Sequence, residues 1–465
     1  MPLCGGRWNN GANAGVFNVN LNNPRSNSNS NIGFRSALPS KSDASYLLGV
    51  LPAPRCKGSY FRAIVAKNKG IIFGGFLWAW NADSSECANY AMLQGDNMSI
   101  KNVFDTISSF DNILTAEQDV RAGGRYDQEE LTFWGGYEDN LHEIAERIQT
   151  LNFPPDLYRS FYVYEPKLRK IVCADYTTKV IQRAVYNILN PLVCKGFISD
   201  TYSCVVDRGH INAMLRLSGW VNYAAASGKT WYYLKTDVEK FFYRINHEIL
   251  MKILRKKIAD KKVIRLMEHY ICEASKPFGL PLGIKNPMDI PDDEMLWDVG
   301  ITIGGGLSHM HGNMYLDPLD QLAKRTYGIK DYIRYMDDII VLSENKEDLH
   351  RYRKEFSDFL GDELQLRLNN KTAIRPISQG IEFVGFRIWP GYVRLRKSTS
   401  LHMKRHLKEM QEKYRRYEVS FDRVNQTVMS YKALMKHCDC AALDKKIFSE
   451  FVLTHNPKEG GVNHG

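Results

Sequence analysis

The sequence lacks the features that would direct a chain out of the cell or into a membrane. Its nine cysteines are an odd number and show no paired spacing, which favours a reducing compartment over a disulfide-bonded secreted fold. No secretory signal is recognisable. The apolar burst at residues 70–80 is interrupted by glycine and is too short to cross a bilayer. We therefore expect a cytoplasmic protein with no membrane partner.

A zinc site is also poorly supported. Cys438 and Cys440 lie close to His437, but no second pair of ligands follows nearby. What the chain does have is positive charge, since 62 Lys and Arg face 52 Asp and Glu, a net charge of +10. A moderate basic excess of this kind suits a nucleic-acid partner.

The excess is concentrated at residues 391–417, where nine basic residues accompany two acidic ones. An apolar stripe recurs there at three- and four-residue steps, which predicts an amphipathic helix with a Lys/Arg face; its members are Met403, Leu407, Met410, Tyr414 and Tyr417. Such a face is often only solvated. It is also the kind of surface that binds duplex phosphates.

Two adjacent carboxylates, Asp337 and Asp338, interrupt the apolar run of residues 333–342. Acids in a core are unfavourable unless a cation neutralises them. The pattern predicts a strand–turn–strand that presents both acids to a divalent metal. Ordinary turn chemistry, in which Asp is common, is the competing interpretation.

A third acid, Asp237, ends a short apolar segment at residues 232–236 and lies about a hundred residues upstream of the pair. Together the three carboxylates would hold two Mg²⁺ ions roughly 3.5–4 Å apart, with Mn²⁺ as an alternative. Few protein ligands suffice, because Mg²⁺ keeps oxygens from water and phosphate. The predicted metal-binding residues are Asp237, Val238, Asp337 and Asp338.

With these acids the chain resembles the palm of a reverse transcriptase. Residues 164–171 resemble the fingers hairpin of bacterial reverse transcriptases, and residues 174–183 resemble the segment after it. The resemblance implies that Arg169 binds the incoming triphosphate, a role that suits its planar fork of donors, although alone it reads as a solvated turn residue. It also implies that Lys371 is a general acid for pyrophosphate. The implied primer grip lies at residues 382–386, with Phe383, Gly385 and Phe386.

Residues 303–309 bear on the subgroup. Their glycines would let backbone approach a base pair closely, and a helix is expected from Met310 to about Tyr327. Most of the superfamily has Gln at the first position and Pro at the last. Polymerases of diversity-generating retroelements have a branched aliphatic residue first and usually Gln last. Ile303 resembles that subgroup, whereas His309 departs from both patterns. The implied nucleotide-binding residues are Arg169, Phe242, Ile303, Gly304, Ser308 and His309.

The amino-terminal stretch points the same way. Ten asparagines fall between Asn9 and Asn31, and the flanking residues resemble the carboxyl end of the lectin-like variable proteins that these retroelements diversify. We interpret residues 5–38 as the template repeat itself, read through in frame, within a low-complexity extension of residues 1–97. A disordered extension is the alternative. Met98 is the expected natural start.

The expected fold class is α/β, a right-hand polymerase with fingers, palm and thumb. Residues 98–398 would form the fingers and palm, and residues 399–455 a helical thumb whose second helix includes residues 428–437. Antiparallel strands at residues 232–236, 332–342 and 382–388 would form the palm sheet. Ser343 is expected to cap a helix that runs through Phe359.

The favoured function is an RNA-directed DNA polymerase that copies a template-repeat RNA into adenine-mutagenised cDNA. Its partners would be template RNA, primer or cDNA, deoxynucleoside triphosphates and a small basic accessory protein, in a bacterial or phage setting. A group II intron or retron polymerase remains an alternative, as does a catalytically inactive RNA-binding protein. A viral RNA-copying RNA polymerase is disfavoured, because Phe242 falls at the sugar-gating position, where its ring would crowd a 2′-hydroxyl. No ribonuclease H or integrase constellation is seen in the sequence.

Overall fold

Four antiparallel strands form the sheet that carries the predicted acids. They are β3 (Tyr232–Thr236), β4 (Tyr332–Tyr335), β5 (Asp338–Ser343) and β6 (Ala373–Pro376), in the spatial order β4-β5-β3-β6. Leu234 of β3 pairs with Val341 on one side and with Ile374 on the other. The strands predicted at residues 232–236 and within 332–342 are confirmed.

The computed structural model describes residues 99–123, 128–154, 156–163, 169–284, 286–303 and 307–455. All of them belong to one compact unit of the chain. The predictions for residues 1–97 lie outside the described residues.

Both faces of the sheet are buried, and alternate side chains enter two different cores. Leu234 and Val341 belong to a core shared with α11 (Ser308–Gln321) and α12 (Lys346–Leu364). The neighbouring Tyr233 and Ile340 belong to a second core. Successive residues of a strand point to opposite faces, so a sheet covered on both sides needs the near-continuous apolar run seen in the sequence.

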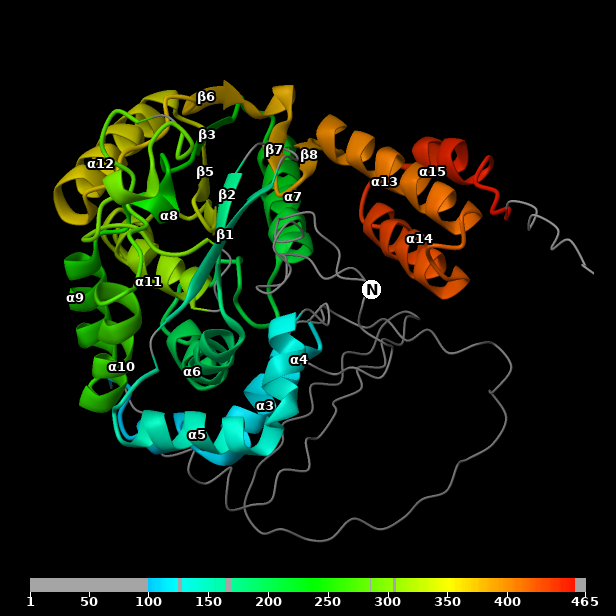
Figure 1. Ribbon diagram of the computed structural model, residues 1–465. Helices are drawn as coiled ribbons and strands as arrows, with labels where there is room; N and C mark the ends of the chain where they lie inside the picture. Colours follow the sequence, from blue (N-terminus) through cyan, green and yellow to red (C-terminus); the bar gives the residue numbers. More distant parts are fainter. Residues whose placement is uncertain are drawn as a thin grey trace, which may run out of the picture. The chain divides into compact units, whose positions relative to one another are not determined.

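Helices α11 and α12 cover the first face, and α12 lies along β3 and β5 (Figure 1). α11 continues into a π-helical turn at Leu322–Thr326, close to the predicted span. The predicted cap of α12 is wrong, because Asn345 rather than Ser343 accepts from the backbone N–H of Glu347 (2.9 Å). Ser343 instead accepts from the N–H of Asn345 (3.1 Å). Both residue types favour caps, so the sequence alone did not distinguish them.

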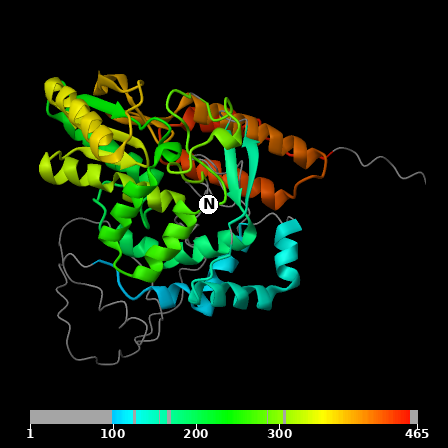
Figure 2. The ribbon, with the colours of Figure 1, turned by 60° about the vertical axis from the view of Figure 1, so that its left-hand side comes forward.

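Helices and one long hairpin precede the sheet. The hairpin consists of β1 (Tyr158–Val163) and β2 (Arg169–Ala174), which pair antiparallel at the position of the predicted fingers hairpin (Figure 2). Asp175 caps the helix after it by accepting from the N–H of Thr178 (3.0 Å). The helices of this region are α2 (Phe104–Ile107), α3 (Phe110–Arg121), α4 (Gln128–Gly135), α5 (Tyr137–Gln149), α6 (Tyr176–Cys194) and α7 (His210–Ala226).

Short helices follow β3 before the chain reaches α11. They are α8 (Phe241–Arg244), α9 (His247–Lys257), α10 (Lys261–Cys272) and a 3-10 turn at Asp292–Glu294. A second 3-10 turn, Ile377–Gln379, follows β6.

The run at residues 382–388 does not join the palm sheet, so that prediction is wrong. It folds into a separate three-stranded sheet of β7 (Ile381–Phe383), β8 (Phe386–Trp389) and β9 (Tyr392–Leu395). Val384 and Gly385, with φ of 40° and 90°, turn the chain between β7 and β8. The place of the predicted strand is taken by β6, which the sequence did not reveal.

Three helices end the described chain: α13 (Lys397–Arg415), α14 (Phe421–Met435) and α15 (Ala441–Phe448). Neighbouring pairs pack together (Figure 1). Met403, Leu407 and Met410 are buried, as the amphipathic pattern of α13 predicts, whereas Tyr417 of the same pattern lies beyond the helix and is exposed. The predicted α/β class, with an antiparallel palm sheet and a helical carboxyl-terminal region, is confirmed. None of the described helices has the length and apolar character needed to cross a membrane.

Candidate active site

The acid pair lies where β4 turns into β5. Tyr335 pairs with Asp338, so Met336 and Asp337 form the connection. Met336 has a φ of 57°, in the left-handed region that is unfavourable for residues other than glycine. Asp337 and Asp338 are both partly exposed, while their apolar neighbours are buried. The hairpin therefore lifts the acids out of the core, as the sequence predicted.

Asp237 follows directly after β3, at the same end of the sheet. The antiparallel segment of residues 367–369 fixes it, because the N–H of Asn369 donates to the Asp237 carbonyl (2.8 Å) and Asn369 Nδ2 lies 3.4 Å from Asp237 Oδ2. The next residue, Val238, is buried and bridges to Leu368. The segment after β3 is thus held by residues 367–369.

Lys235 connects the acid pair to the small sheet. Its Nζ donates to Asp338 Oδ2 (3.0 Å) and also to the carbonyl of Glu382 in β7. Burial raises the pKa of Asp338 above its ordinary value, the Lys235 ammonium opposes that shift, and the Asp237 carboxylate adds to it. Asp237 and Asp338 therefore act on each other electrostatically across the end of the sheet.

The carboxylates of Asp237, Asp337 and Asp338 are suitable ligands for a hard divalent cation, although the three side chains do not converge on one point. Within the described ranges, no three His, Cys, Asp or Glu side chains are close enough together to hold a metal ion. Asp338 Oδ1 is buried and has no hydrogen-bond partner, so this oxygen is available as a ligand. Carboxylate oxygens are the protein ligands that Mg²⁺ prefers, and one or two suffice when phosphate and water supply the rest.

Lys371 lies in the turn before β6, two residues after Asn369. Its N–H donates to Asn369 Oδ1 (3.0 Å), and Asn369 in turn holds Asp237. The Lys371 side chain is exposed.

A second cluster contains most of the predicted nucleotide-binding residues. Phe242 lies on α8, five residues after Asp237, and its carbonyl accepts from the N–H of Ile301 (2.9 Å). Its ring meets that of His309 edge-on, with centroids 5.7 Å apart. Burial lowers the pKa of His309 to about 4, so this imidazole is neutral at physiological pH.

Thr302 and Ser308 contact each other through their side chains. Ser308, the first residue of α11, is buried, and its hydroxyl lies 3.0 Å from that of Thr302. Ile303 is partly buried. Gly304 lies outside the described residues. Arg169 begins β2, but its side chain also lies outside the description.

The predicted primer-grip residues Phe383, Gly385 and Phe386 are all buried. The Phe383 ring packs edge-on against that of Tyr335, with centroids 6.4 Å apart. The Gly385 carbonyl accepts from the N–H of Arg396 (2.9 Å). These residues shape the β7–β8 turn, and Phe383 supports the β4–β5 hairpin that carries Asp337 and Asp338. Because all three residues are buried, a primer would contact other atoms of this turn.

Two charged residues near the acids were missed by the sequence analysis. Lys235 precedes Asp237 by two residues, and Arg334 stands in an otherwise apolar strand. A charge in a buried strand requires a partner of opposite charge or a hydrogen-bond acceptor. The sequence alone could therefore have indicated that Lys235 and Arg334 each have such a partner. The partners themselves, in β5, β7 and α11, become apparent only in the folded chain.

Comparison with known proteins indicates the class of domain that contains these residues. Residues 164–388 match the family described as reverse transcriptase (RNA-dependent DNA polymerase). The match identifies a reverse transcriptase domain, the domain of an RNA-directed DNA polymerase, and confirms that part of the sequence prediction. Asp237, Phe242, Asp337 and Asp338 all fall within the matched residues.

Individual relatives are more distant. Protein YkfC of Escherichia coli (strain K12) is 23% identical over 283 residues, covering 53% of this chain and 71% of the relative. Apo telomerase from Candida tropicalis has a TM-score of 0.41 at 12% identity, covering 62% of this chain and 59% of the telomerase chain. Telomerase from Candida albicans, in complex with a fragment of telomeric RNA, has a TM-score of 0.37 at 11% identity, covering 66% and 57%. The chain thus spans less than two thirds of these telomerase chains.

Proposed function

We propose that the protein is the RNA-directed DNA polymerase of a diversity-generating retroelement, which copies a template-repeat RNA into adenine-mutagenised cDNA. The reverse transcriptase domain supports the polymerase chemistry. The observation that carries the proposal is that Asp237 and Asp338, about a hundred residues apart in sequence, lie at the same end of the palm sheet, because Thr236 pairs with Ile339. Ile303 and the asparagine-rich amino-terminal segment support the subgroup.

In this proposal Asp237, Asp337, Asp338 and the Val238 backbone hold divalent metal, Mg²⁺ or Mn²⁺. A bound ion would supply activation of the primer 3′-hydroxyl and stabilisation of the leaving pyrophosphate. Lys235 offsets the charge of Asp338 and keeps its carboxylate oriented. Lys371 donates a proton to pyrophosphate.

The remaining residues select and orient the substrate. Arg169 binds the triphosphate of the deoxynucleotide, and the Phe242 ring excludes a 2′-hydroxyl. Ile303, Gly304, Ser308 and His309 line the pocket of the nascent base pair. The β7–β8 turn holds the primer.

The domain assignment belongs to the same proposal. Residues 98–398 would be fingers and palm, and residues 399–455 the thumb that follows duplex phosphates through the basic face of α13. The structure begins α13 at Lys397, two residues before that boundary. A small basic accessory protein, template RNA and primer are the proposed partners, in the cytoplasm. Residues 1–97 are the proposed read-through of the template repeat.

The test is the error spectrum of the purified protein on an adenine-rich RNA template with a DNA primer. We expect substitutions to concentrate opposite template adenine, and Ile303→Gln to reduce them while extension continues. Small packing differences are worth only about 1–3 kcal/mol of discrimination, so a looser pocket admits mispairs. Accurate copying at adenine would favour a group II intron or retron polymerase. Binding of RNA without any extension would favour an inactive RNA-binding protein.

A further inference from the structure

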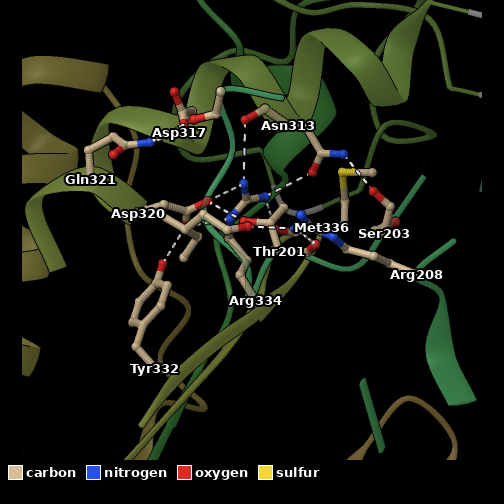
Figure 3. A network of polar contacts seen from close by, with 12 residues as sticks. Thr201, Ser203, Arg208, Asn313, Asp317, Asp320, Gln321, Tyr332, Arg334 and Met336 are labelled. Carbon is tan, nitrogen blue, oxygen red and sulfur yellow. Dashed lines mark hydrogen bonds and ion pairs between the residues drawn. The ribbon is translucent and has the colours of Figure 1, made fainter. Parts of the chain in front are cut away.

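A fully buried arginine lies directly behind the turn that carries the acids. Arg334, in β4, is 0% exposed. Figure 3 shows its guanidinium surrounded by Asp320 and Asn313 of α11 and by Met336 of the turn. The backbone of Arg334 is fixed as well, since its N–H donates to the Asp200 carbonyl (3.0 Å) and its carbonyl accepts from Tyr202 (3.1 Å).

All five N–H groups of this guanidinium have an acceptor. Nε and Nη2 donate to the two carboxylate oxygens of Asp320 (2.7 and 2.6 Å). Nη1 donates to Asn313 Oδ1 (3.1 Å) and to the Met336 carbonyl (2.8 Å), and Nη2 lies 3.4 Å from the Asn313 carbonyl. Only the planar fork of arginine offers five donors in this fixed arrangement.

The acceptors are fixed by further bonds. Asp320 also accepts from the Tyr332 hydroxyl (2.6 Å) and the Thr201 hydroxyl (2.8 Å). Asn313 Nδ2 donates to the Ser203 carbonyl (2.6 Å). The guanidinium therefore cannot shift without breaking bonds to two elements at once (Figure 3).

Met336 is held at both its carbonyl and its side chain. Its carbonyl accepts from Arg334, and its left-handed φ of 57° is a conformation that needs such support in a residue other than glycine. Its side chain packs on α11, because a Cβ added at Gly312 would lie 3.2 Å from Met336 Sδ. Met336 directly precedes Asp337, so its conformation sets the direction of that carboxylate.

We propose that Arg334 is a positioning residue for nucleotide addition. It fixes the Met336 turn, and hence Asp337, and it links this turn through Asp320 and Asn313 to α11. The first residues of α11, Ser308 and His309, belong to the proposed nucleotide pocket. Arg334 therefore fixes the position of Asp337 relative to this pocket. This inference rests on the proposed polymerase function.

The test is Arg334→Lys in the full-length protein, studied by pre-steady-state addition of one deoxynucleotide to a primer on RNA, with primer–template in excess over enzyme. Lysine keeps the positive charge beside Asp320, but its three donors on one nitrogen cannot replace the five bonds that the planar guanidinium makes. We expect the rate constant to fall between roughly ten- and a hundred-fold, as for small misplacements of reacting groups. We expect the burst amplitude, which counts folded active sites, and the affinity for primer–template to stay at the wild-type level.

A matched control is Arg183→Lys. In the wild-type protein the Arg183 guanidinium makes a buried ion pair with Asp119 between α6 and α3 (2.9 and 3.0 Å). We expect that variant to lose thermal stability and burst amplitude at an unchanged rate constant. The same behaviour in Arg334→Lys would mean that Arg334 only stabilises the fold, and would overturn the proposal.

A second variant covers the case in which Arg334→Lys does not fold. Gly312→Ala adds a Cβ 3.0 Å from Phe241 Cε1 and 3.2 Å from Met336 Sδ, so these two side chains must move by a few tenths of an ångström while every buried charge stays in place. Slower addition at unchanged burst amplitude supports the proposal, and a wild-type rate constant overturns it. Wild-type protein that adds no nucleotide on any template would overturn the proposed function instead.

Discussion

The imidazole of His309 lies edge-on against the ring of Phe242, with centroids 5.7 Å apart and an interplanar angle of 80°. The two residues come from different elements, α11 and α8, and both were assigned to the nucleotide pocket from the sequence. The contact means that the proposed sugar gate does not stand alone. His309, which departs from the pattern of related polymerases at this position, supports the ring that would exclude ribonucleotides.

Phe242→Ala is expected to admit ribonucleotides, because the proposed block is the ring itself. The measurement is the ratio of incorporation efficiencies for a deoxynucleotide and the matching ribonucleotide on the same RNA template. If that ratio is unchanged, Phe242 is a core aromatic residue and the gate lies elsewhere.

His309→Ala is expected to relax the same ratio by a smaller amount. An edge-to-face aromatic pair contributes about 0.5–1.5 kcal/mol, which corresponds to roughly two- to ten-fold. Because burial lowers the pKa of His309 to about 4, the imidazole stays neutral and the wild-type ratio should be constant from pH 6 to 8. His350→Ala, at an exposed position of α12, is the control that should leave the ratio unchanged. A ratio in His309→Ala equal to that of the control would contradict a supporting role.

Buried histidines predict a loss of stability in acid. Burial lowers the pKa of His210 to about 4 and that of His311 to about 3, from an ordinary value of 6.5. Between pH 6.5 and 4 these groups are protonated in the unfolded chain and neutral in the folded one, so the free energy of unfolding falls as the pH falls. Each such histidine contributes up to about 1.4 kcal/mol per pH unit.

His311→Leu should therefore lose less stability than wild type between pH 7 and pH 5. His311 Nε2 is buried without a hydrogen-bond partner, so leucine removes the titration without breaking a bond at that atom. Denaturant unfolding of both proteins at the two pH values measures the difference. Equal losses would show that His311 does not govern the acid response.

The sequence predicted the centre of the palm well, because the information there is local. Residues 232–236 are an apolar run followed by Asp237 and form β3, and residues 332–342 are an apolar run interrupted by Asp337 and Asp338 and form β4 and β5. The run at residues 382–388 has similar composition but contains Val384 and Gly385, whose positive φ values break it into a hairpin of another sheet. β6 is short and mostly only half-buried, so its pattern carried little signal.

At the candidate site, the sequence pattern and the resemblance to reverse transcriptases indicated Asp237, Asp337 and Asp338. They did not indicate the residues that hold these acids in position. Arg334 and Lys235 were visible in the sequence as charges within apolar strands. Their partners lie far away along the chain, at Asp320 and Asn313 for Arg334 and at Asp338 and Glu382 for Lys235. Only the folded sheet and α11 bring these pairs together. Sequence periodicity and motif spacing therefore could not predict these contacts.

The most direct test of the central claim is Mg²⁺-dependent primer extension on RNA by Asp338→Asn and Asp337→Asn. Removing either charge should abolish extension, because these carboxylates are the proposed metal ligands. Asp358→Asn, at an exposed position of α12, is the control that should extend primers as wild type does. Thermal unfolding of each variant should establish that the fold persists. Loss of extension in both site variants, with the fold intact, is the result that the account predicts. Near-normal extension by either one would contradict the assignment of this hairpin as the catalytic site.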